Sequence, residues 1–232
     1  MYDFLETAIK NSYESCHILR DTDHRRIEVI RHKTSGNRYI LRKYTGSGSA
    51  YAKLSKIRCP HIPVVYEVAQ KGDQVLVLEE YIVGDTLQSL LSSGPLEPRQ
   101  VRDISSQLCD ALWVLHKLEL IHRDIKPENV MLRGRDTILI DFDASRLYNK
   151  EKSSDTQVLG TVGYAPPEQY GISQTDPRSD IYSLGVLMNV MLTGVHPSVK
   201  MASGRMGFII RRCTMTNTKQ RFNNILQVRA LL

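Results

Sequence analysis

Two polar segments in the middle of this chain constrain it more than any other feature. The first, His122–Asn129, reads HRDIKPEN, and the second, Asp141–Asp143, begins twelve residues after Asn129 and reads DFD. Either segment alone would be modest evidence. In this order and spacing they supply a carboxylate base, a cation and two oxygen ligands for a metal ion. A chain that uses them must fold so that these side chains meet, and they are the parts that phosphoryl transfer needs.

Four residues carry this chemistry. Asp124 is the candidate base, because a substrate hydroxyl needs a carboxylate within hydrogen-bond reach to orient it and accept its proton. Lys126 can neutralise charge on the transferring phosphoryl group. Asn129 and Asp141 offer the hard oxygen ligands that Mg²⁺ takes, with Mn²⁺ as an alternative ion. A charged surface loop would explain one such residue but not four in this order.

Two further segments and one arginine strengthen the pattern. Together with the first two segments, they resemble a eukaryotic-like (Hanks-type) serine/threonine protein kinase domain of compact bacterial type. Gly160–Glu168 (GTVGYAPPE) is similar to the peptide-binding loop of that family, and Asp180–Val186 (DIYSLGV) is similar to the start of the central helix of its large lobe. The resemblance implies that His122–Asn129 is the catalytic loop, that Asp180 holds its backbone and that Glu168 pairs with Arg221.

The resemblance also implies an activity, namely ATP- and Mg²⁺-dependent transfer of the γ-phosphate to Ser/Thr hydroxyls of proteins. The peptide-binding loop favours a protein substrate over a small molecule. Autophosphorylation is expected as well, because Arg123, beside the base, can pair with a phosphate on the loop that contains Ser153, Ser154 and Thr156. A plain polar loop is an equally good interpretation of those three residues.

The patterning predicts an α+β fold with a strand-rich small lobe and a mainly helical large lobe. Alternating or β-branched stretches predict five strands, at Ser15–Leu19, Arg26–His32, Arg38–Tyr44, Val64–Gln70 and Gln74–Glu80. Apolar spacing predicts helices at Ala50–Arg58, Thr86–Ser92, Pro98–Leu118, Asp180–Leu192, Phe208–Cys213 and Phe222–Leu231. Gly84 marks the change of pattern, so we expect one kinase domain over 1–232, with a small lobe at 1–80, a hinge at 81–84 and a large lobe at 85–232.

The small lobe departs from the family in three places. The turn at Arg20–Arg25 should be rich in glycine, so that backbone N–H groups can approach the phosphates of ATP, but it contains no glycine. Arg20, His24 and Arg25 are candidates to compensate. The phosphate-gripping lysine of the third strand is replaced by Arg42, or by Lys43 if the alignment moves by one residue; these two side chains face opposite ways because side chains alternate along a strand. Ala50 stands where a helix glutamate should pair with that lysine.

Glu79 is the candidate to replace the missing glutamate. It lies at the back of the expected nucleotide site, where a buried carboxylate is costly unless it is paired. We therefore expect an ion pair between Glu79 and Arg42 or Lys43. The adjoining segment Glu80–Ile82 should bind adenine through backbone groups of Glu80 and Ile82, and Asp85 is placed to hydrogen-bond the ribose. Asp143 takes the place of the last glycine of Asp-Phe-Gly, which adds a charge near the metal ligands.

Charge distribution leaves two alternatives open. Between Arg20 and Arg58 there are eleven Lys/Arg and three Asp/Glu, an excess of eight positive charges in a chain of net charge +6. One alternative is therefore a pseudokinase, a nucleotide-binding or non-catalytic scaffold that docks a partner through its basic small lobe. Nucleic-acid binding is a weaker alternative, because no aromatic interleaving or known motif supports it beyond charge.

Composition bears on location. The four cysteines are widely scattered and none has the spacing of a metal site or a disulfide framework, which favours a reducing, cytoplasmic setting. No apolar run reaches the length of a membrane span, and the N-terminus does not resemble a signal peptide.

Overall fold

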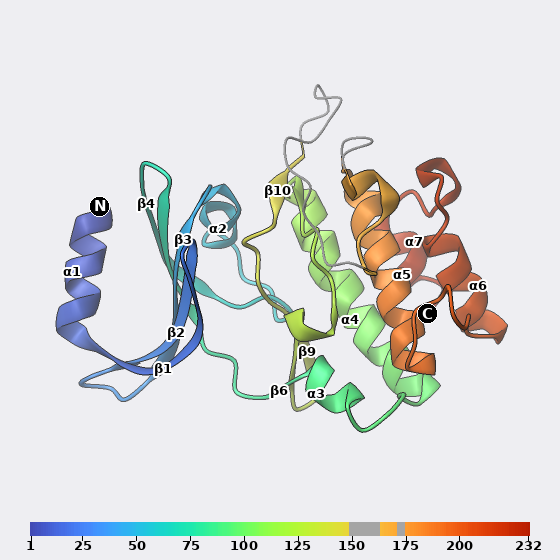
Figure 1. The fold of residues 1–232 in the computed structure, drawn as a ribbon, viewed down its shortest axis with the longest axis horizontal. Coiled ribbons are helices and arrows are strands. Elements are labelled where there is room, and N and C mark those ends of the chain that lie inside the picture. Colours follow the sequence, from blue (N-terminus) through green and yellow to red (C-terminus); the bar gives the residue numbers. More distant parts are fainter. Residues whose placement is uncertain (149–162, 171–174) are drawn as a thin grey trace. The chain divides into compact units, whose positions relative to one another are not determined.

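In the computed structural model, which describes residues 1–148, 163–170 and 175–232, the contacts divide the chain into two units. The small unit comprises Met1–Cys59 and Pro63–Val83, and the large unit comprises Pro60–Ile62 and Gly84–Leu232. The small unit is built on an antiparallel sheet and the large unit is mainly helical (Figure 1). The predicted α+β fold class is therefore confirmed.

The small unit contains one five-stranded antiparallel sheet with the strand order β1-β2-β3-β5-β4. The strands are β1 (Tyr13–Thr22), β2 (Arg25–His32), β3 (Arg38–Thr45), β4 (Val65–Lys71) and β5 (Gln74–Glu80). All five predicted strands are present, and β5 has the predicted bounds. The expected turn at Arg20–Arg25 is shorter than predicted, because β1 and β2 pair as far as Thr22 and Arg25 and leave only Asp23 and His24 between them.

A helix at the N-terminus, α1 (Tyr2–Ser12), covers one face of this sheet and was not predicted (Figure 1). Its apolar residues Tyr2, Leu5 and Ile9 recur at helical spacing and pack on the sheet. The sheet residues under it include Ile30, Leu41, Ala69, Leu76 and Leu78. We call this side of the sheet the α1 face. Three apolar positions in one short segment were the signal that could have revealed the helix.

The other side of the sheet, here called the Arg42 face, carries Arg25, Ile27, Val29, Ile40, Arg42 and Glu79. Residues directly opposite each other in an antiparallel pair share a face, so the register alone assigns these side chains. A short helix, α2 (Ser49–Leu54), follows β3. It is shorter than the predicted Ala50–Arg58, and it buries both Ala50 and Leu54.

Helices dominate the large unit. They are α3 (Leu87–Leu91), α4 (Pro98–Lys117), α5 (Pro177–Thr193), α6 (Gly204–Cys213) and α7 (Ile225–Arg229). α4 has the predicted amphipathic form, and its expected apolar face is buried at Ile104, Leu108, Ala111, Leu112 and Leu115. It begins with a capping box formed by Glu97 and Gln100 and has Pro98 in its first turn, which fits the preferences of helix N-termini.

α5 lies beside α4 and is apolar on nearly all sides (Figure 1). Asp176 caps its first turn, and Gly194, with a φ of 76°, ends it in the left-handed conformation that glycine adopts most readily. The helix is a buried core helix, as predicted. None of the described helices is both long enough and apolar enough to cross a bilayer.

Short strands complete the large unit and position its functional loops. β6 (Asp85–Thr86), β8 (Val130–Arg133) and β9 (Asp136–Leu139) form a three-stranded sheet, and β7 (Leu120–Ile121) pairs with β10 (Arg146–Leu147). Gly84 approaches β8 so closely that a β-carbon there would lie 2.1 Å from the carbonyl oxygen of Leu132. Glycine is therefore required at this position by the packing of β6 on β8.

Candidate active site

The catalytic loop is anchored by Asp180, which lies in the first turn of α5. Its carboxylate is fully buried and accepts hydrogen bonds from the backbone N–H groups of His122, at 3.0 Å, and Arg123, at 2.9 Å. His116 of α4 contacts the same carboxylate at 2.9 Å through Nε2. The expectation that Asp180 holds the loop backbone is confirmed, and the contribution of His116 was not foreseen.

The anchor creates a pH dependence of stability. Burial by itself raises the pKa of Asp180, but the hydrogen bond and charge of His116, the charge of His122 and the backbone N–H of Arg123 outweigh it, so the pKa lies below its usual value of 3.8. A depressed pKa stabilises the folded state above the unfolded-state pKa, and this contribution is lost as the pH falls through the folded-state value. We expect the melting temperature of the wild type to fall more steeply below about pH 4 than that of Asp180→Asn. Parallel slopes in a thermal-unfolding series would contradict this.

Asp124, Lys126 and Asn129 form a hydrogen-bonded cluster inside this loop. Asp124 Oδ2 lies 2.9 Å from Lys126 Nζ and accepts a 2.9 Å hydrogen bond from Asn129 Nδ2. The Asn129 amide also donates to the carbonyl oxygen of Asp124 at 2.8 Å. The structure thus brings the candidate base, cation and amide ligand together, and it fixes the carboxylate orientation through two donors on one oxygen.

The β8–β9 hairpin brings Asp141 next to Asn129. Asn129 precedes β8 and Asp141 follows β9, and the backbone N–H of Ile140 donates to the carbonyl oxygen of Asn129 at 2.9 Å. Asp141 has a φ of 70°, in a region that aspartate tolerates better than most side chains. Asp143 has no positive φ, so the backbone there does not require the glycine that the family pattern has.

The donors at this site suit a divalent cation of the magnesium type. The Asn129 side chain uses its nitrogen to donate to Asp124, which leaves its amide oxygen as the atom that can accept or ligate. Asp141 adds a partly buried carboxylate. No group of three or more His, Cys, Asp or Glu in the described ranges could hold a metal by itself. Mg²⁺ is commonly bound by one or two side chains together with substrate phosphates, so the pair Asn129 and Asp141 fits this use.

His122 links the two polar segments. Its Nε2 lies 3.2 Å from the carbonyl oxygen of Ile140, and its Nδ1 accepts from the N–H of Asp124 at 3.3 Å. The ring also packs edge-on against Phe142, with 5.2 Å between centroids. These contacts tie the catalytic loop to the segment that carries Asp141.

The expected ion pair between Glu168 and Arg221 is present and buried. Arg221 donates to the two carboxylate oxygens of Glu168 at 2.6 and 2.9 Å. The next residue, Gln169, was not singled out from the sequence. Its amide donates to the carbonyl oxygen of Arg123 at 2.6 Å, so the segment after the peptide-binding loop also holds the catalytic loop. A buried glutamine beside a conspicuous motif carried no periodic signal that could have identified it.

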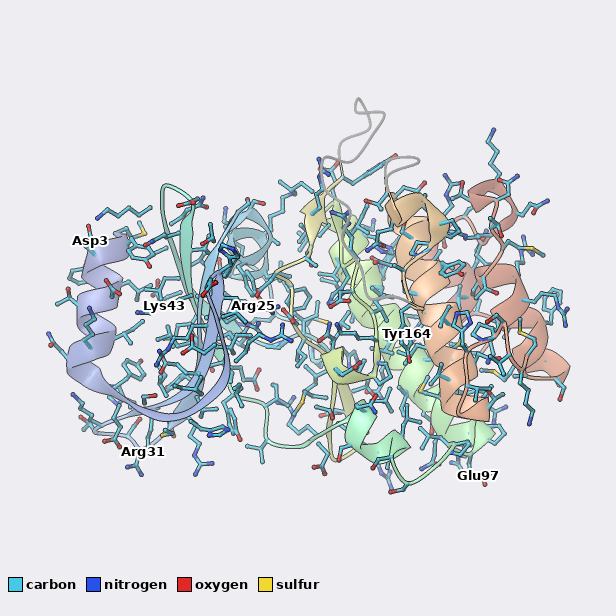
Figure 2. The ribbon with its side chains drawn as sticks, in the orientation of Figure 1. Asp3, Arg25, Arg31, Lys43, Glu97 and Tyr164 are labelled. Carbon is cyan, nitrogen blue, oxygen red and sulfur yellow. The ribbon has the colours of Figure 1, made fainter. Side chains whose placement is uncertain are left out.

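The peptide-binding loop is described only from Gly163 onward. Tyr164 in this part is half-buried, and burial together with the negative charge of Glu128 raises the pKa of its hydroxyl to about 12 (Figure 2). The phenol is therefore neutral at physiological pH and can donate a hydrogen bond. The first three residues of this loop, Gly160–Val162, lie outside the described residues. So do Ser153, Ser154 and Thr156 of the loop that precedes it.

In the small unit, Arg42 and Glu79 form the ion pair that the sequence suggested. Arg42 Nε lies 2.5 Å from Glu79 Oε1, and the two side chains are 5% and 3% exposed. Lys43 lies on the α1 face instead, with its Nζ 2.9 Å from Glu6 Oε1 of α1 (Figure 2). The alternation of side chains along β3 decides between the two cations: only Arg42 shares a face with Glu79.

This pair should contribute strongly to stability when one partner is removed. Glu79→Met removes the buried carboxylate that pairs with Arg42, so we expect it to lower the free energy of unfolding by about 3–5 kcal/mol. The double variant Arg42→Met/Glu79→Met should recover much of that loss. Lys43→Met is the matched control, because the Lys43–Glu6 pair is about one-third exposed and such pairs contribute about 1 kcal/mol or less. Urea unfolding is measured for the wild type, these three variants and the single variant Arg42→Met. If the losses of Arg42→Met and Glu79→Met simply add in the double variant, the coupling is refuted.

The other residues expected to contact the nucleotide lie from the end of β5 to the start of β6. Glu80 ends β5, and its carboxylate accepts from the N–H of Val64 at 3.1 Å. Ile82 is buried, and Asp85 is exposed at the start of β6. The positions of Glu80, Ile82 and Asp85 in the fold are therefore known. Their contacts with a nucleotide stay predictions.

The basic excess of the small unit is partly balanced by acids that lie far away in the sequence. Glu14 pairs with Arg31, Glu6 with Lys43, and Glu79 with Arg42. None of these three acids falls between Arg20 and Arg58, so counting charges in that stretch overstated the net charge of the folded surface.

Comparison with known proteins identifies the family of this chain. The protein kinase domain family matches residues 43–228. The chain is 35% identical over 152 residues to the serine/threonine-protein kinase pkn2 of Myxococcus xanthus, covering 62% of this chain and 18% of that protein. It is 33% identical over 174 residues to the serine/threonine-protein kinase PknL of Mycobacterium tuberculosis, covering 74% and 43%. Against the serine/threonine-protein kinase PknA of a Nostoc species it is 39% identical over 145 residues, covering 59% and 26%.

The chain therefore spans less than half the length of each of these relatives. The family match begins at Lys43, so it omits α1, the glycine-free hairpin and Arg42, which are the parts that depart from the family pattern. It includes the whole of the anchored catalytic loop, the β8–β9 hairpin and the Glu168–Arg221 pair. On this match, the chain belongs to the protein kinase domain family.

Proposed function

We propose that this chain is a serine/threonine protein kinase domain that transfers the γ-phosphoryl group of ATP to hydroxyl groups of proteins, including its own. Protein kinases use ATP together with a divalent cation, and Mg²⁺, or Mn²⁺ in its place, is the ion that we propose here. The observation that carries the proposal is the Asp124 cluster: a carboxylate is oriented by Lys126 and Asn129 in a loop whose backbone is tied to the buried Asp180.

The chemistry follows from this cluster. A Ser or Thr hydroxyl that donates to Asp124 is oriented for attack on the γ-phosphorus, and its proton passes to the carboxylate as the new O–P bond forms. The bond between the γ-phosphorus and the bridging oxygen breaks, and ADP leaves. Lys126, beside Asp124, offsets the negative charge on the transferred group. Asn129 and Asp141 would hold the cation, which when bound neutralises phosphate charge.

On the small unit we propose Arg42, paired with Glu79, at the position of the usual lysine, in preference to Lys43. We also propose 81–84 as the hinge, Glu80 and Ile82 as backbone contacts for adenine, and Asp85 as a contact for the ribose. The change of unit between Val83 and Gly84 supports this division.

The proposal is tested by transfer of labelled phosphate from ATP to a generic basic protein and to the chain itself, followed by identification of the phosphorylated amino acid. We expect phosphoserine or phosphothreonine, and a loss of about 10²-fold or more in Asp141→Asn. Asparagine also tolerates the left-handed backbone at this position, so the variant should fold. Phosphate found on tyrosine only, or transfer unchanged in Asp141→Asn, would contradict the proposal.

A pseudokinase remains the second candidate, because the β1–β2 hairpin has no glycine and Ala50 takes the position of the helix glutamate. It predicts a different result in the same assay. ATP would raise the melting temperature, since a ligand that binds only the folded state stabilises it, but no phosphate would be transferred with either Mg²⁺ or Mn²⁺.

A further inference from the structure

We propose that Gln169 is a positioning residue for phosphoryl transfer, because it fixes the peptide group that joins Arg123 to the base Asp124. This inference rests on the proposed function, since it takes Asp124 as the base. Gln169 is 1% exposed, and its side-chain amide donates to the carbonyl oxygen of Arg123 at 2.6 Å. Gln169 therefore acts on the base through the backbone.

The peptide group between Arg123 and Asp124 is held at both of its polar ends. Gln169 binds its carbonyl oxygen, and its N–H, which belongs to Asp124, donates to Nδ1 of His122 at 3.3 Å. A peptide group is planar, so two hydrogen bonds at opposite ends fix the direction of the plane. The Cα atom of Asp124 lies in that plane. Loss of the Gln169 bond removes the shorter of the two hydrogen bonds that orient it.

The backbone of Arg123 needs such support. Its φ is 71°, in the left-handed region that side chains other than asparagine and aspartate rarely adopt. A conformation of this kind persists where the surrounding contacts hold it. The N–H of Arg123 donates to Asp180 on one side, and its carbonyl oxygen accepts from Gln169 on the other. Without Gln169, the residue can relax and turn the plane that carries the base.

The segment that contains Gln169 is itself anchored to α5. Gln169 lies in a short 3-10 helix, η2 (Pro167–Tyr170), and Ser179 of α5 donates to the carboxylate of the preceding residue at 3.0 Å. One turn further along α5, Ser183 Oγ donates to the carbonyl oxygen of Tyr164 at 3.0 Å. The same part of α5 carries the aspartate that holds the catalytic loop. The base and the described end of the peptide-binding loop are thus tied to one helix, and Gln169 joins them directly.

The test makes the same substitution at two glutamines of the large unit. Gln169→Met removes the amide that binds the catalytic loop. Gln107→Met is the control: the Gln107 amide of α4 donates to the carbonyl oxygen of Arg135 at 2.9 Å and accepts from the N–H of Thr137 at 2.8 Å. These contacts lie at the turn of the β8–β9 hairpin, the end opposite to the expected metal ligands. Steady-state transfer from ATP to a generic basic protein, and urea unfolding, are measured for the wild type and both variants.

We expect Gln169→Met to lower kcat about tenfold to 10²-fold and to leave the KM for ATP within about twofold of the wild type, because a misplaced base slows the chemical step. Gln107→Met should lose some unfolding free energy and keep the wild-type kcat. The assays are run at a temperature at which all three proteins are folded, so that kcat reports the active site.

The outcomes separate this inference from the proposed function. If the wild type transfers phosphate and Gln169→Met keeps a kcat within about threefold of it, the inference is wrong and the kinase function stands. An equal loss of kcat in Gln107→Met would also overturn it, and so would a rise in the KM for the protein substrate alone. A wild type that transfers no phosphate overturns both proposals. If Gln169→Met fails to fold, Gln169→Asn decides: it keeps the amide but is one methylene group shorter, and a wild-type kcat would count against the inference.

Discussion

Replacing Asp124 by Asn is expected to lower phosphoryl transfer by about 10²–10⁴-fold, the range associated with general-base catalysis, while ATP binding stays near the wild-type value. The observed geometry indicates that this substitution can leave the neighbouring contacts in place. Lys126 and Asn129 both approach the same carboxylate oxygen, Oδ2. The amide oxygen of asparagine can take that place and keep both contacts, while the proton-accepting carboxylate is removed.

The assay for this prediction is steady-state transfer to a Ser/Thr protein, with ATP affinity measured separately. Asp136→Asn is the matched control: it makes the same chemical change in the large unit, at an exposed residue of β9 whose nearest cation, Arg133, lies 3.9 Å away. It should transfer phosphate at the wild-type rate. Transfer in Asp124→Asn within about threefold of the wild type would exclude Asp124 as the base, since even the low end of the expected range is about 10²-fold.

Arg221→Met is expected to destabilise the protein by about 3–5 kcal/mol, the largest effect on stability that we anticipate in the large unit. Arg221 is 1% exposed. Besides Glu168, its guanidinium bonds the carbonyl oxygens of Met215, at 2.7 Å, and Arg178, at 3.0 Å. It also lies 4.9 Å from the ring centre of Tyr182. The substitution removes the charged partner of the buried Glu168 carboxylate and, at the same time, the hydrogen-bond donor to several carbonyl groups.

Urea unfolding followed by a large-unit probe measures this effect. Arg229→Met is the control, because the Arg229–Asp110 pair is 46% and 37% exposed on its two sides. An exposed pair of this kind contributes about 1 kcal/mol or less. If the two variants lose similar amounts of unfolding free energy, the buried contacts of Arg221 do not stabilise the protein more than an exposed ion pair does.

The long helix and the catalytic loop of the large unit could be predicted because the residues that define each of them lie close together in the sequence. The helix in which Ile104, Leu108 and Leu115 share a face appears within one residue of its predicted end. The segment HRDIKPEN predicted a base, a cation and a ligand that the structure brings together. Short spacing makes such a cluster almost independent of the rest of the fold, since residues within five positions of each other in a tight loop have few ways to lie apart.

Other contacts could not be predicted because they join residues far apart in the chain. Gln169 reaches Arg123, and His116 reaches Asp180, through packing that brings separate segments together. Helix α1 was missed because the apolar positions that mark its buried face, Tyr2, Leu5 and Ile9, span only about two turns of helix. The net positive charge of the segment between Arg20 and Arg58 was overestimated because its acidic partners are distant in the sequence. Glu6, Glu14 and Glu79 approach the segment only in the folded state.

By itself, the sequence determined the family and the α+β class, and it predicted which residues meet in the Asp124 cluster, because these depend on residue types at short spacing. The choice between Arg42 and Lys43 was left to the tertiary structure. Strand alternation puts the two on opposite faces, and only the pairing of β3 with β5 and the packing of α1 decide which acid each one meets. The same register puts Arg25 on the Arg42 face and Arg26 on the α1 face, where Asp21 and Glu28 pair with Arg26. Neighbouring residues of one strand therefore meet different partners.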